Sequence, residues 1–128
     1  MNENEISRVV VDSAIEVHKT LGGPGLLENI YRDAMIFEIR NRGVEIEKEK
    51  LVPVVYKGEN ISTPLRLDLL VGRLVVVECK ASTIYNTIFE SQLLTYLRLS
   101  NLKLGLVINF GQKLVKHGIH RVVNGLEE

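Results

Sequence analysis

The segment 65–81, LRLDLLVGRLVVVECKA, constrains the fold most, because it sets charged residues into two otherwise apolar runs. The leucine and valine runs on either side of Gly72 predict a β-hairpin. Side chains alternate between the faces of a strand, so Glu78 and Lys80 share one face while Cys79 takes the other. The rest of the second strand is apolar on both faces, and we expect it to be covered on both sides.

Moving an ionised Glu or Lys out of water costs several kcal/mol per ion unless it is paired or bound to a metal. A three-residue loop at 71–73 places Asp68 opposite Val76 and diagonal to Glu78 on the same face, roughly 7–8 Å away. A two-residue loop would separate the carboxylates by the whole sheet, so we expect an odd-length turn. Two carboxylates and an ammonium group at a strand end then predict a site for Mg²⁺. The alternative is a surface hairpin with three solvated charges.

Length and composition indicate an ordinary globular protein. The 128 residues are 45% hydrophobic and 25% charged, and we expect one domain over 1–128. The polar, acidic start predicts no signal peptide, and no apolar run approaches a membrane span. The only cysteine, Cys79, cannot form an internal disulfide, so it predicts a core position and a cytoplasmic protein.

The formal net charge is zero, whereas a protein that holds duplex nucleic acid usually shows a basic footprint. Basic residues gather only near the hairpin and again over 113–121. This balance argues against tight autonomous DNA binding but allows a small catalytic core that acts locally or with a partner. We expect His18 to be solvated on a helix flank, and a single cysteine without paired ligand spacing makes zinc an unsuitable ion.

Hydrophobic spacing predicts helices over 3–20, 26–42 and 84–101. It predicts strands over 44–56, 65–70, 74–80 and 104–110, with a weaker edge strand over 118–123. The resulting order is α-α-β-β-β-α-β-β. The helix between the strands 74–80 and 104–110 predicts a crossover between parallel neighbours, so the fold class is α/β with a mixed sheet flanked by helices and the charged strand near its centre.

Two pairs of polar residues share helix faces. Glu28 and Tyr31 lie three apart after a Gly/Pro turn, and Gln92 and Tyr96 lie four apart on the later helix. Taken alone, Glu28 suits the positive end of a helix dipole, with Tyr31 in the core. Taken alone, Gln92 and Tyr96 suit a half-buried helix face.

Five stretches together resemble the GxxExxY protein family, in order and over nearly the whole chain. They are GLLENIY at 25–31, LDLLV at 67–71, VECKA at 77–81, QLLTYL at 92–97 and GLVINFG at 105–111. The resemblance implies a PD-(D/E)XK nuclease-like protein with a restriction-endonuclease-like core. Leu67 replaces the proline of the superfamily name, Cys79 stands where Leu or Val is usual, and Phe89 stands where many relatives carry His.

The resemblance also implies roles for these residues. Asp68, Glu78 and Lys80 match the D…ExK core, and Gln92 with Tyr96 matches the QxxxY motif of RecB-type and lambda-exonuclease-type nucleases. Asp68 and Glu78 would hold Mg²⁺ or Mn²⁺, and Lys80 would orient the attacking water or stabilise charge on the phosphate. Glu28 would support the metal site as the acidic residue of an N-terminal helix.

The resemblance therefore implies a divalent-metal-dependent nuclease, with DNA as the favoured substrate. Gln92 and Tyr96 would position Lys80 and the phosphate backbone, and we expect Tyr31 to take part in nucleic-acid binding as well. The zero net charge predicts weak binding that salt reduces further. No sequence preference follows, because phosphate contacts carry none. One alternative is a non-catalytic nuclease-fold module that binds nucleic acid or a protein partner. Another is a self-associating module or homodimer, suggested by the apolar first helix.

Overall fold

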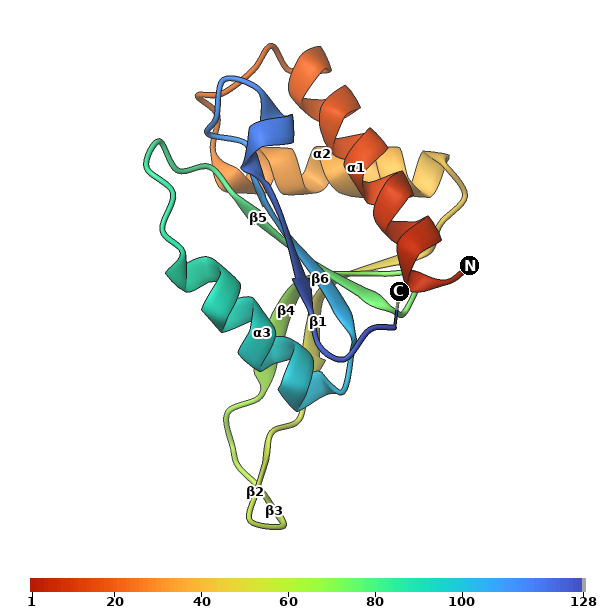
Figure 1. The fold of residues 1–128 in the computed structure, drawn as a ribbon, viewed down its shortest axis with the longest axis vertical. Coiled ribbons are helices and arrows are strands. Elements are labelled where there is room, and N and C mark those ends of the chain that lie inside the picture. Colours follow the sequence, from red (N-terminus) through yellow and green to blue (C-terminus); the bar gives the residue numbers. More distant parts are fainter. Residues whose placement is uncertain (128) are drawn as a thin grey trace.

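The central sheet has five strands, and the strand that carries Glu78 and Lys80 is the middle one (Figure 1). The computed structural model describes residues 1–127, so residue 128 of the expected domain lies outside the described residues. In spatial order the strands are β1 (Ile46–Val52), β4 (Leu65–Val71), β5 (Val75–Lys80), β6 (Leu104–Asn109) and β7 (Ile119–Val123). β5 and β6 run parallel and the other neighbours run antiparallel. The mixed sheet and its element order agree with the sequence prediction.

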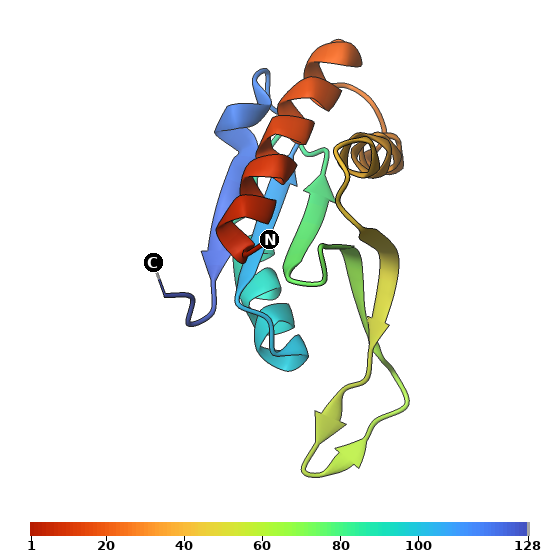
Figure 2. The ribbon, with the colours of Figure 1, turned by 90° about the vertical axis from the view of Figure 1, so that its right-hand side faces the viewer.

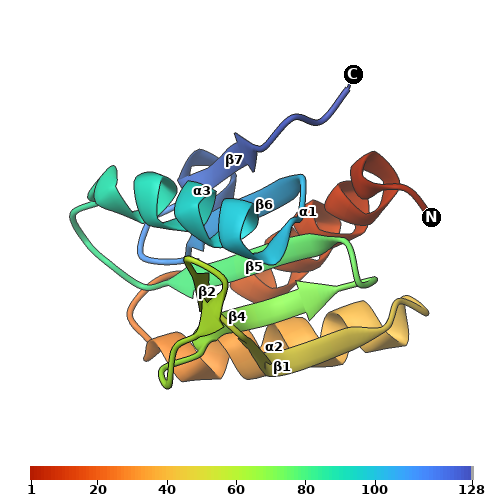
Figure 3. The ribbon, with the colours of Figure 1, turned by 90° about the horizontal axis from the view of Figure 1, so that it is seen from below.

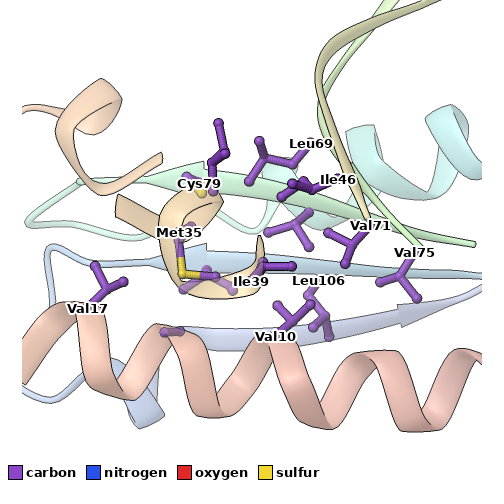
Figure 4. Packing of buried hydrophobic residues seen from close by; sticks show 14 of the residues in the cluster. Val10, Val17, Met35, Ile39, Ile46, Leu69, Val71, Val75, Cys79 and Leu106 are labelled. Atoms are coloured by element: carbon purple, nitrogen blue, oxygen red, sulfur yellow. The ribbon is translucent and has the colours of Figure 1, made fainter. Parts of the chain in front are cut away.

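Three helices cover the two faces of this sheet (Figure 3). α1 (Glu3–Thr20) and α2 (Glu28–Asn41) pack on one face, and α3 (Ile88–Ser100) packs on the other. A core cluster lies on each face, and Figure 4 shows the larger one, in which Cys79 is buried as expected. None of the helices within residues 1–127 is long and apolar enough to cross a membrane.

The expected strand over 44–56 is divided. β1 ends at Val52, directly before Pro53, which has no N–H to donate to a strand ladder. The chain then forms a small separate hairpin from β2 (Val55–Tyr56) and β3 (Glu59–Asn60), which projects from the body of the molecule (Figure 2). A short 3₁₀ helix, η1 (Val115–Gly118), precedes β7.

The turn between β4 and β5 has odd length, as predicted, but the expected register is wrong by two residues. Val71 pairs with Val75, so the turn comprises residues 72–74 instead of 71–73. Arg73 adopts a left-handed backbone conformation with φ 64°. Its guanidinium group forms an ion pair with Glu45, which directly precedes β1. Continuing this register brings Asp68 directly opposite Glu78 instead of diagonal to it.

His18 is buried, so the expectation that it is solvated is wrong. Its Nε2 lies 3.1 Å from the carbonyl oxygen of Phe110, at the end of β6. Phe110 in turn stacks on Tyr31 of α2, with ring centroids 4.6 Å apart. These contacts join α1 and α2 to the sheet at the carboxyl end of β6.

Tyr31 also holds the loop between α1 and α2. Its hydroxyl donates to the carbonyl oxygen of Gly23 at 2.8 Å and accepts from the N–H of Leu26 at 3.1 Å, while its ring is fully buried. The loop leads directly into Glu28, so the placement of that residue depends on the Tyr31 hydroxyl.

We predict that Tyr31→Phe lowers the free energy of unfolding by about 1–2 kcal/mol, because it removes two hydrogen bonds and keeps the ring. Chemical denaturation measures this change. Tyr56→Phe is the matched control: Tyr56 is 58% exposed, and we expect a change within about 0.5 kcal/mol. Equal effects of the two variants would contradict the role assigned to the Tyr31 hydroxyl.

Candidate functional site

Asp68 and Glu78 meet between two strands, where each carboxylate bonds the backbone of the opposite strand. The N–H of Asp68 donates to Glu78 Oε2 at 2.8 Å, and the N–H of Cys79 donates to Asp68 Oδ2 at 2.9 Å. The regular β4–β5 pairing stops one residue earlier, at Leu69 and Val77. The two carboxylates therefore take over from the backbone ladder at this point.

The regular alternation of β4 also breaks at Asp68. Leu67 packs in the cluster beneath α3 and Leu69 in the cluster beneath α1 and α2, although residues two apart in a regular strand share a face. On the neighbouring strand, Glu49 lies at the matching register position with a left-handed φ of 55°. The expectation of a shared face rested on a regular strand, and the carboxylates meet through this distortion instead.

Arg32 of α2 binds the same aspartate, and sequence analysis did not single it out. Its guanidinium Nη1 lies 3.1 Å from Asp68 Oδ1, and Nη2 lies 3.8 Å from a carboxylate oxygen of Glu49. The Arg32 and Asp68 side chains are only 19% and 15% exposed. Within residues 1–127, the buried Arg32 Nε has no hydrogen-bond partner. The sequence signal for Arg32 is its position four residues after Glu28, on the same helix face.

The surroundings of Glu78 and Glu28 disfavour the ionised forms of these two carboxyl groups. Burial, followed by the charges of Asp68 and Glu28, raises the pKa of Glu78 from 4.5 to about 7, against the hydrogen bond from Asp68 and the charge of Lys80. The pKa of Glu28 is also raised, by shielding from water and by Asp68, while Lys80 and Arg32 oppose the rise. Glu28, Asp68, Glu78 and Lys80 thus lie within electrostatic reach of one another.

Residues of α3 cover the other side of this cluster. The ammonium group of Lys80 lies 4.7 Å from the ring centre of Phe89, a cation–π contact. Burial and the charge of Glu78 raise the pKa of Tyr96, so Tyr96 lies within electrostatic reach of that carboxylate.

Gln92 and Tyr31 form no side-chain hydrogen bond with the carboxylates among residues 1–127. Gln92 is exposed one turn before Tyr96, and its side chain makes no hydrogen bond to any residue in the described part of the chain. Tyr31 is buried against Phe110 and holds the loop before Glu28. We therefore expect Tyr31 to affect a ligand only by fixing the position of that loop and of Glu28 after it.

A buried asparagine holds the segment that follows Lys80. The side chain of Asn109 accepts from the N–H of Ser82 at 2.9 Å and donates to the Ser82 carbonyl oxygen at 3.0 Å. It also accepts from the N–H of Gly111 at 3.0 Å. The sequence indicates no separate role for Asn109, whose side chain connects the segment after β5 to the turn after β6.

The donor set suits a hard divalent cation with few protein ligands. Among residues 1–127, no three His, Cys, Asp or Glu side chains are arranged to hold a metal ion. Mg²⁺ commonly uses only one or two carboxylates and fills its other positions with water and substrate phosphate. Asp68 and Glu78 supply such a pair, and the raised pKa of Glu78 indicates a position where a cation would relieve repulsion. Arg32 supplies positive charge to Asp68 in the metal-free protein.

We predict that the metal-free protein becomes less stable as the pH rises from about 4.5 to 7. Over this range the folded protein keeps a proton on Glu78 that the unfolded chain has released. The resulting contribution is complete below the unfolded pKa and is lost as the pH passes the folded value, with a total of roughly 3 kcal/mol. Melting temperatures in EDTA measure it. Glu78→Gln should flatten the profile and Glu59→Gln, on the projecting hairpin, should not; a wild-type profile in Glu78→Gln would contradict the assignment.

Comparison with known proteins agrees with the geometry. The family model described as the PD-(D/E)XK nuclease superfamily matches residues 4–122. No curated protein and no solved structure matches the chain significantly. The match includes Asp68, Glu78 and Lys80 and both helices that flank them. The chain belongs to the PD-(D/E)XK nuclease superfamily.

Proposed function

We propose that the protein is a divalent-metal-dependent nuclease that hydrolyses phosphodiester bonds, with DNA as the favoured substrate. The main support is the paired arrangement of Asp68 and Glu78 at the strand gap, with Lys80 two residues further along β5. Superfamily membership supports nuclease chemistry in general. The choice of DNA, of Mg²⁺ or Mn²⁺ and of a cytoplasmic location belongs to the proposal.

Asp68 and Glu78, with the carbonyl oxygen of Cys79, are the groups that would hold Mg²⁺ or Mn²⁺. When bound, such an ion lowers the pKa of a water molecule and polarises a phosphoryl oxygen. Asp68 accepts the N–H of Cys79 and faces Arg32, and these contacts would orient its carboxylate. Glu78 would lose its proton as the ion binds, since the positive charge of the ion would oppose the burial and the neighbouring negative charges that raise its pKa.

Lys80 would act on the reacting phosphate. Its ammonium group lies against the apolar Phe89 ring and not in an ion pair with any carboxylate in residues 1–127, so it remains available to an anion. There it would orient the attacking water and stabilise negative charge that develops on the phosphoryl oxygens. Glu28 would hold a proton or an additional water molecule at the entrance of the site.

Tyr96 and Gln92 would position the nucleic-acid backbone from α3. Tyr96 approaches Glu78, and Gln92 lies one turn earlier with its side chain exposed and able to donate to a phosphate. These contacts are to the backbone, so the enzyme would cleave without base preference.

One observation favours a second candidate function, a nuclease-fold module without catalysis. Arg32 occupies Asp68 Oδ1 and the N–H of Cys79 occupies Oδ2, so protein groups already satisfy both oxygens. A module that had lost its metal could use the same fold to bind nucleic acid or a protein partner, including a second copy of itself. The two candidate functions differ in whether a metal ion displaces the Arg32 guanidinium from Asp68.

We predict that millimolar Mn²⁺ raises the melting temperature of the wild-type protein, because an ion that binds the folded state stabilises it. Asp68→Asn should remove the rise. Arg32→Gln should increase the apparent Mn²⁺ affinity, by up to about tenfold, since the ion no longer displaces a guanidinium group. Isothermal calorimetry measures the affinities. An identical Mn²⁺ response in the wild type and Asp68→Asn would show that the metal site lies elsewhere.

We also predict that the purified protein cleaves DNA at low ionic strength with Mn²⁺, more slowly with Mg²⁺, and not with EDTA. Lys80→Ala should lower the cleavage rate at least about 100-fold while Mn²⁺ binding persists, because Lys80 acts on the phosphate and not on the ion. Gel assays with linear, nicked, branched and single-stranded DNA and with RNA measure the rates.

Two outcomes would decide against catalysis. Unchanged cleavage by Lys80→Ala would identify a contaminating nuclease. Failure to cleave any of the five substrates, together with metal-independent nucleic-acid binding, would establish the non-catalytic module.

A further inference from the structure

A cavity of about 520 Å³ lies between the end of α1 and the segment that carries η1. Three lysines line it, Lys19 from α1 and Lys113 and Lys116 from the other side. Its lining contains no carboxylate, and within residues 1–127 none of the three ammonium groups forms an ion pair. In a chain whose net charge is zero, this is a concentrated positive site. We refer to it as the lysine cleft.

The inner surface of the lysine cleft is apolar. Two of its lining side chains, Ile15 and Leu114, are 44% and 50% exposed and leave apolar surface open to solvent. Gly22 and Gly23 form another part of the wall, and no heavy atom lies within 4 Å of where their Cβ atoms would be. The lining of the cleft therefore combines apolar side chains with three ammonium groups.

Both walls of the lysine cleft are connected to the candidate active site. The N–H of Phe110 donates to the carbonyl oxygen of Lys80 at 2.8 Å, so the chain that reaches Lys113 starts beside Lys80. Three residues from Phe110 to Lys113 span at most about 11 Å. On the other wall, Gly23 precedes Glu28 by five residues, at most about 18 Å.

We propose that the lysine cleft binds single-stranded nucleic acid that continues from the scissile phosphate. Ammonium groups neutralise phosphates, and the apolar lining accepts an unpaired base. A base-paired strand cannot present a base to a cavity of this size, so the proposal is limited to single strands. It rests on the proposed function for the position of the scissile bond.

The salt dependence of binding tests the proposal. The affinity of a fluorescent single-stranded 12-mer is measured by anisotropy in EDTA over a range of salt concentrations, so that neither metal nor cleavage contributes. The slope of log K against log salt changes by about 0.7 per phosphate contact for single strands. Replacing Lys19, Lys113 and Lys116 together with Gln should reduce the slope by up to about 2. The lysines are exposed, so the fold should persist.

The matched control replaces Lys57 and Lys103 with Gln. Lys57 lies on the projecting hairpin and Lys103 directly before β6, at the opposite end of that strand from Phe110. This control should leave the slope unchanged. A 12-base-pair duplex should bind the wild type and the triple variant equally.

Several outcomes would overturn the proposal. They are an unchanged slope in the triple variant, an equal reduction in the control, an equal effect on the duplex, or an acidic peptide that displaces the 12-mer more strongly than unlabelled 12-mer does. Hydrolysis of bis(p-nitrophenyl) phosphate with Mn²⁺ separates this result from the proposed function, because so small a diester does not extend to the cleft. Normal hydrolysis with an unchanged slope rejects the cleft alone. A reduced slope without hydrolysis supports the cleft and rejects the nuclease.

Discussion

The reciprocal hydrogen bonds between β4 and β5 determine the arrangement of the whole site. Each strand contributes one carboxylate that accepts a backbone N–H of the other strand, at 2.8 and 2.9 Å. These bonds satisfy backbone donors that would otherwise be left without partners where the ladder ends. They also hold Asp68 and Glu78 beside each other at a position surrounded by apolar strands. The fold thus uses the same two side chains to complete the sheet and to build a negatively charged centre.

This centre is costly to keep, and the surrounding residues reduce the cost in different ways. Arg32 neutralises Asp68 from α2, and Glu78 takes up a proton more readily than an exposed glutamate does. Lys80 is held against Phe89 and remains near both carboxylates without forming an ion pair in residues 1–127. A divalent cation would replace both the guanidinium charge and the proton. The metal-free arrangement is therefore consistent with a site in which a bound cation replaces the charge of Arg32 and the proton on Glu78.

Much of the fold could be predicted from sequence because local patterns and topology agree. The apolar run of β5 and the helical spacing before β6 led to the correct mixed sheet and the central position of β5. The register of β4 against β5 could not be predicted, because a turn over 71–73 and a turn over 72–74 have the same odd length. Pro53 and the left-handed Glu49 alter the edge strand through backbone geometry that periodicity does not report.

The proximity of Asp68 and Glu78 could be predicted from the sequence, but the contacts that they make could not. Asp68, Glu78 and Lys80 follow from charges in an apolar strand, whereas Arg32 approaches from a helix that is distant in sequence. His18 was misplaced for the same reason, because its partner Phe110 lies 92 residues away. Long-range polar contacts of this kind depend on how helices dock on the sheet, and one sequence does not specify that docking.

The most direct test of the central claim is a crystal structure of the protein soaked in Mn²⁺, with anomalous differences measured. We predict one anomalous peak in contact with carboxylate oxygens of both Asp68 and Glu78, with the Arg32 guanidinium moved away from Asp68. An anomalous peak elsewhere, or no peak and an intact Arg32–Asp68 ion pair at millimolar Mn²⁺, would contradict it.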